Sequence, residues 1–147
     1  MRAALQVSSG NESVLTTEQA LHELLRMAGK ELGLSKKDAH GAAQGGVMRV
    51  DGVHVSISCF ETDVQRDAII VAKLNVPVNP ASIRQLLEIN LVATIALGST
   101  IAIDCDGQAI LLSLLPIFTS SHTFLANHIS QMALFANTLE LQIANRF

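Results

Sequence analysis

Residues 101–117 read IAIDCDGQAILLSLLPI, and this stretch has the pattern of a β-hairpin. The pair Asp106-Gly107 tolerates the positive φ angles of a tight turn, and apolar runs precede and follow it. Alternation along the first strand places Cys105 on the same side as Ile101, so we predict that this cysteine is buried. Its sequence neighbours are acidic, and no histidine lies close to it in the sequence, which disfavours a nucleophilic role.

The same pattern occurs earlier in the chain. Asp51-Gly52 lies between two segments of alternating apolar residues, 47–50 and 53–59, and predicts another hairpin. The next segment, residues 68–76, is apolar on both faces in its first half, which is typical of a central or covered strand. We therefore predict five strands that pair as antiparallel neighbours.

Three helices are predicted beside these strands. Residues 16–32 open with a threonine and a glutamine spaced as a capping box, and leucines follow at helical spacing. Residues 79–97 and 120–146 carry two further apolar stripes. Glycines break the pattern between residues 35 and 46, so we expect a loop there that contains no more than a short helical turn.

The resulting order is α-β-β-β-α-β-β-α, an α+β fold in which helices flank a twisted antiparallel sheet. We expect residues 16–147 to form a single domain, preceded by a flexible N-terminal arm of residues 1–15.

The composition points to an apolar interface. Hydrophobic residues make up 49% of the chain and aromatic residues only 3%, so the apolar surplus is aliphatic. A small domain of this kind is expected to bury part of that surface against another subunit or a partner. Residues 110–115 allow two readings: a strand covered by helices on both faces, or a strand with one face in the core and one in a dimer or client groove. The net charge of −3 argues against nucleic acid as the main ligand.

Sequence signatures of catalysis are weak. The histidines show no HExxH spacing, the glycines form no phosphate-binding loop, and no serine occupies a GxSxG turn, so neither a metal nor a cofactor is expected. A cysteine-dependent enzyme that uses Cys59 or Cys105 with a histidine is kept as the less favoured alternative. The apolar run at residues 91–103 is too short to cross a bilayer, which needs about 20 residues. With no secretory signal pattern and no CxxC pair, we expect a cytoplasmic protein with free thiols.

Three segments together resemble a known family. They are LLEINL at residues 86–91, IAID with its Asp-Gly turn at 101–107, and LLSLLPI at 111–117. With the element order and chain length, they resemble the class I chaperones of bacterial type III secretion, the Tir chaperone (CesT) family. The resemblance implies a homodimer that binds the N-terminal segment of a secreted effector and keeps it export-competent without ATP or cofactor. It also implies the secretion ATPase as a candidate partner, and no membrane insertion.

The resemblance also suggests site residues. The second helix and the last hairpin would build the dimer interface, through Leu87, Asn90, Leu91, Leu112 and Leu114. The first helix and the first three strands would offer client grooves, with Leu25, Leu32, Val55, Ile57, Ile69 and Val71 as candidates. The last helix departs from the family pattern, because it lacks tryptophan and carries only one glutamate, Glu140. A general protein-binding adaptor of the same fold is the other alternative.

Overall fold

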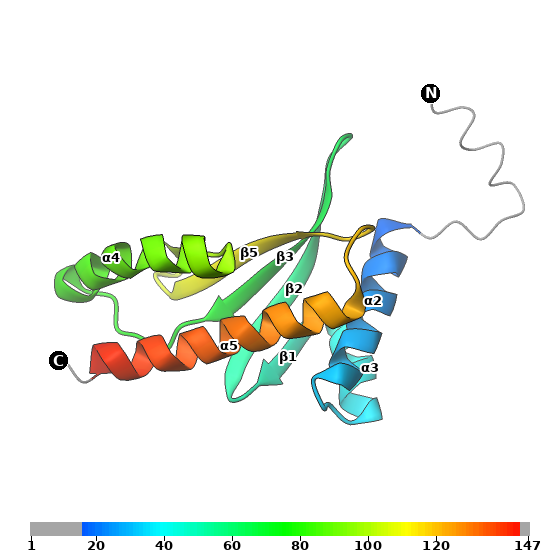
Figure 1. The fold of residues 1–147 in the computed structure, drawn as a ribbon, viewed down its shortest axis with the longest axis horizontal. Coiled ribbons are helices and arrows are strands. Elements are labelled where there is room, and N and C mark those ends of the chain that lie inside the picture. Colours follow the sequence, from blue (N-terminus) through cyan, green and yellow to red (C-terminus); the bar gives the residue numbers. More distant parts are fainter. Residues whose placement is uncertain (1–15, 145–147) are drawn as a thin grey trace, which may run out of the picture.

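The computed structural model describes residues 16–144, so the predicted arm of residues 1–15 lies outside the described part. Four helices and five strands follow one another in the chain (Figure 1). They are α2 (Thr17–Glu31), α3 (Lys36–Gly45), β1 (Val47–Val50), β2 (Val53–Glu61), β3 (Arg66–Lys73), α4 (Pro80–Leu97), β4 (Thr100–Ile103), β5 (Ala109–Pro116) and α5 (His122–Ala144). The predicted α+β class is confirmed.

The strands form one antiparallel sheet in the order β1-β2-β3-β5-β4. Both predicted hairpins are present, and β3 is the central strand. In the first hairpin, Asp51 and Gly52 have φ angles of 50° and 82°, the left-handed values that a two-residue turn of this kind requires. The two edges of the sheet are therefore β1 and β4.

The prediction that Cys105 is buried was wrong, because β4 ends at Ile103 and strand alternation does not reach the cysteine. The Asp104 carboxylate accepts hydrogen bonds from the backbone N–H groups of Asp106 and Gln108, each at 2.9 Å. These bonds organise a loop between the strands, and Cys105 is exposed on that loop.

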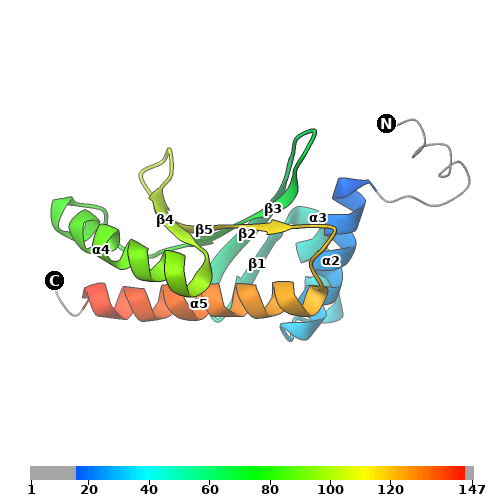
Figure 2. The same ribbon diagram turned by 45° about the horizontal axis from the view of Figure 1, so that its top comes forward.

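One face of the sheet packs against helices. The helix α5 runs across the sheet and contacts β1, β2, β3 and β5, while α2 contacts β2 and α5 (Figure 2). The strands β2, β3 and β5 pair without a bulge, so the core-facing side chains of each strand lie beside those of its neighbour. The buried strand residues on this face include Val53, Val55, Ile57, Ala68, Ile70, Ala72, Leu111, Ser113 and Leu115.

The helix ends follow from local sequence. Thr16 and Gln19 form the predicted capping box at the start of α2. Asn79 caps α4, where its side chain accepts a hydrogen bond from the N–H of Ser82 at 2.9 Å, and Pro80 occupies the first turn. Gly98 ends α4 in a left-handed conformation with φ 66°.

The helix α3 occupies the segment that we expected to be a loop. Ser35 caps it by accepting a hydrogen bond from the N–H of Asp38, and its alanines pack on α2. A methyl group at Gly29 of α2 would lie only 3.0 Å from the Ala39 Cβ, so glycine allows the close approach of the two helices. Gly46 then turns the chain into β1 with φ 69°, where any side chain would collide with a carbonyl oxygen of β2.

Candidate protein-binding surfaces

The outward face of α4 is an unpaired apolar stripe. Ile83, Leu87, Leu91 and Ile95 follow one another at intervals of four residues. The last three are 67%, 65% and 76% exposed, whereas the opposite face of the helix buries Ser82, Leu86 and Ala93. We call these four residues the α4 stripe. Isolated exposed leucines need no explanation, but a continuous row of large aliphatic side chains marks an interaction surface.

Asn90, which the resemblance assigned to the dimer interface, has a role within the chain. Its Oδ1 accepts a hydrogen bond from the backbone N–H of Ile101 at 2.7 Å. This bond joins α4 to the edge strand β4 and satisfies a backbone donor there. The side chain therefore fixes the position of α4, and with it the position of the α4 stripe.

The sheet face opposite α5 carries a second apolar patch. In the register of β3 with β5, Ile69 lies opposite Leu114, and Val71 lies opposite Leu112. Leu114 is 51% exposed, and the other three are half-buried. The sequence assigned the β3 pair to a client and the β5 pair to a dimer, whereas the structure places all four in one cluster. Residues 110–115 therefore form a strand with one face in the core and the other face partly exposed, and not a strand covered by helices on both faces.

The remaining predicted client residues lie deeper. Val55 is completely buried, so it packs in the core and offers no surface. Leu25 and Ile57 are also buried, although both line a pocket of about 350 Å³ between α2, α3 and β2. Leu32 is half-buried in the wall of a different pocket, of about 510 Å³, where the end of α2 approaches α5 and the first hairpin. The six residues therefore do not form one continuous groove.

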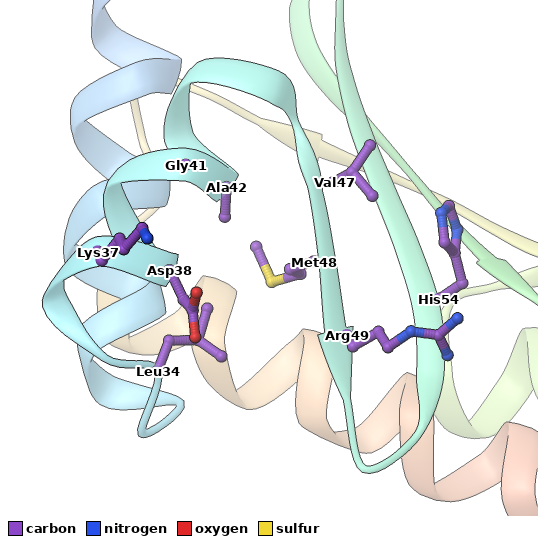
Figure 3. Close-up of a pocket in the computed structure, with 9 residues that line it drawn as sticks. All are labelled: Leu34, Lys37, Asp38, Gly41, Ala42, Val47, Met48, Arg49 and His54. Atoms are coloured by element: carbon purple, nitrogen blue, oxygen red, sulfur yellow. The ribbon is translucent and has the colours of Figure 1, made fainter.

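A groove that the sequence did not predict lies between α3 and β1. It has a volume of about 530 Å³, with α3 and β1 as its two walls (Figure 3). Ala42, Val47 and Met48 supply apolar atoms, Lys37 and Arg49 supply positive charge, and Asp38 supplies one carboxylate. We call it the β1 groove. Its wall α3 was missed because the glycines were read as a loop, although the Ser35-x-x-Asp38 capping pattern could have revealed it.

The β1 groove lies beside backbone groups that have no partner within residues 16–144. The N–H of Ile57 donates to the Gly46 carbonyl oxygen at 2.6 Å, and these two residues lie opposite each other in the register of β1 with β2. This bond shows which residue pairs along the two strands are hydrogen-bonded and which are not. Since bonded and non-bonded pairs alternate in antiparallel strands, the N–H and C=O groups of Val47 and Arg49 point away from β2. An extended polypeptide can pair with these groups and place alternate side chains in the groove.

The surroundings of Cys59 disfavour a reactive thiol there. Burial, and next the carboxylates of Glu61 and Glu18, raise the pKa of the Cys59 thiol, which disfavours the nucleophilic thiolate. Between residues 16 and 144, no group of three or more His, Cys, Asp or Glu side chains is close enough to hold a metal ion. None of the helices described is long and apolar enough to cross a membrane.

Two solved structures contain a chain with a similar fold. A chain of the HopA1–SchA chaperone–effector complex matches with a TM-score of 0.64 and 16% identity, over 86% of this chain and 98% of the other. A chain from the structure of the Yersinia pestis type III secretion chaperone SycH, in complex with a stable fragment of YscM2, matches with a TM-score of 0.59 and 21% identity. That match covers 81% of this chain and 98% of the other. This chain has the fold of a type III secretion chaperone.

The likeness is one of fold, because both identities are low. No protein-family model and no curated protein matches the sequence.

Proposed function

We propose that this chain is a cytoplasmic class I type III secretion chaperone of the Tir chaperone (CesT) family, which binds the N-terminal segment of an effector. The observation that carries the proposal is the β1 groove, which lies along the edge strand β1 on a fold shared with chaperone–effector complexes. A protein that works by holding a client needs apolar surface outside its own core, and it needs neither ATP nor a cofactor for that task. The thiol chemistry described above gives no support to the enzyme alternative.

The α4 stripe is proposed as the interface of a homodimer. A helix with an apolar outer face can pack against the same helix of a second copy around a two-fold axis. Each residue of the stripe then contributes to the interface once from each protomer. Leu87 and Leu91 remain the interface residues in this proposal, because they are the exposed members of the original set on α4. Asn90 acts indirectly, through its bond to β4.

The client is proposed to bind in extended form. Its backbone would pair with the open edge of β1, and its apolar side chains would enter the β1 groove. The patch formed by Ile69, Val71, Leu112 and Leu114 offers a second place where aliphatic side chains of the same client can be covered. Held in this way, the segment stays unfolded but does not aggregate, which suits export through a narrow channel. The secretion ATPase is the partner that would receive the loaded complex.

Co-expression tests the proposal. The chain is produced with the N-terminal segment of each effector secreted by the same organism, and each segment is also produced alone. We expect at least one segment that is insoluble alone to become soluble and to co-purify with the chain. If every segment behaves the same with and without the chain, the chaperone proposal is wrong. If the chain instead captures a protein that is not secreted, the adaptor of the same fold is the better description.

A further inference from the structure

A strongly basic pocket lies between α2 and α3, on a protein whose net charge is −3. It has a volume of about 450 Å³ and is lined by Ala39 and by five basic residues: Arg26, Lys30, Lys36, Lys37 and His40. Four of the ten lysine and arginine residues of the chain therefore surround one pocket. Neither the fold nor the proposed dimer accounts for such a concentration of positive charge.

Most of this charge has no partner. Arg26 is held by Glu23 through two bonds, from Nε to Oε1 at 2.8 Å and from Nη2 to Oε2 at 2.9 Å. Within residues 16–144 the other ion pairs are Arg66 with Glu61 and His122 with Glu31, so none of the three lysines is paired there. Like charges that are gathered without counter-charges repel one another, and an anion in the pocket would relieve that repulsion.

The position of the lysines on α3 strengthens this argument. Lys36 and Lys37 are the first two residues of a ten-residue helix, at the end where the helix dipole already carries partial positive charge. Acidic residues are the side chains that stabilise this end of a helix, and the first turn holds one, Asp38, while the two lysines are placed against the dipole. Their ammonium groups and the dipole would act together on a negatively charged ligand.

The basic pocket and the β1 groove have one lining residue in common. Lys37 lines both of them, so a chain that lies along β1 can pass over this residue into the pocket. We propose that the basic pocket binds a segment rich in aspartate and glutamate that belongs to the same client polypeptide and adjoins the strand in the β1 groove. This inference rests on the proposed function and adds to it a rule for client selection: an acidic run next to an apolar strand.

The chemistry of the pocket favours a series of carboxylates over a single phosphate group. Bidentate recognition of phosphate depends on a free guanidinium group, and that of Arg26 is already bound to Glu23. The three lysines instead present separate point charges on flexible stems, which suits carboxylates spaced along a peptide. Charge of this kind also accelerates the encounter with a client and rejects basic segments.

Two synthetic peptides test the inference with the full-length chain. Both contain the same alternating valine–threonine strand, followed in one by a run of glutamates and in the other by a run of glutamines. Affinities are measured by fluorescence anisotropy at about 0.1 M and about 1 M salt, where the Debye length is about 10 Å and about 3 Å. The variants are Lys30→Gln and Lys36→Gln. The matched control is Arg84→Gln, which removes one positive charge from the exposed surface of α4.

We expect the glutamate peptide to bind roughly tenfold more tightly than the glutamine peptide at low salt and about equally at high salt. Each lysine variant should reduce that advantage about two- to fivefold, and Arg84→Gln should leave it unchanged. Equal affinities at low salt would overturn the inference and leave the proposed function intact. An equal loss in the arginine control would also overturn it, since the effect would then be one of net charge. If neither peptide binds, both the inference and the client site proposed at β1 are wrong.

Discussion

Substitution of Leu91 by alanine should separate dimer formation from folding. Leu91 lies in the middle of the α4 stripe and is 65% exposed within one chain. Truncation there removes no contact from the core of the protomer, and alanine favours the helix at least as well as leucine does. The variant should therefore fold with unchanged stability as a protomer, while its self-association weakens.

The size of the effect follows from the exposed fraction. The substitution removes roughly three carbon atoms, each worth about 0.8 kcal/mol when it is transferred from water to a buried site. If the dimer covers the part of Leu91 that is now exposed, the loss is about 1.5 kcal/mol for each protomer and about 3 kcal/mol for a two-fold dimer. This corresponds to a dissociation constant raised roughly a hundredfold.

Sedimentation equilibrium over a series of protein concentrations measures this constant directly. Leu134→Ala is the matched control, because Leu134 has the same exposure of 65% but lies on α5. We expect the control to associate like the unmodified chain. If Leu134→Ala weakens association as much as Leu91→Ala does, or if Leu91→Ala has no effect, then the α4 stripe is not the dimer interface.

Three further substitutions test the account of the fold. Asn90→Ala removes the acceptor of the Ile101 N–H and should lower the free energy of unfolding by about 1–3 kcal/mol in urea titrations; an unchanged midpoint would contradict the role given to that bond. Burial lowers the pKa of His128 below its usual 6.5, so the unfolded chain binds this proton more tightly and stability should fall as the pH drops through 6.5. His128→Gln should flatten that fall in thermal melts from pH 7 to 5, and an identical pH profile would refute it. Gly46→Ala should destabilise by about 1–3 kcal/mol, because its positive φ and the carbonyl oxygen of β2 exclude a methyl group, whereas Gly45→Ala, with open space around it, should cost nothing. Equal stability of the two alanine variants in the same titrations would show that Gly46 is not constrained.

Local signals in the sequence were enough to predict most of the fold. The two Asp-Gly pairs placed the hairpins, and the Thr16 cap placed the start of α2. These features act over four or five residues, so they need no knowledge of the tertiary structure. The helix α3 was missed because its glycines lower helix propensity, and packing of its alanines on α2 outweighs that cost.

The candidate surfaces were harder to predict, because exposure depends on which elements meet. Alternation along β5 correctly separated two faces, but only the sheet order brings Ile69 and Leu114 together. Likewise, leucine at position 25 and leucine at position 91 occur in similar apolar stripes, yet one is buried and the other exposed. The basic pocket arises where two helices converge, so its lysines appear scattered in the sequence.

Hydrogen exchange of the chain with and without a co-purified effector segment tests the central claim most directly. The claim is that the client pairs with the edge of β1 while α4 holds the dimer. We predict slower exchange of the Val47 and Arg49 amides in the complex, with α4 equally protected in both states. Unchanged exchange along β1, or loss of protection in α4 when the client binds, would contradict it.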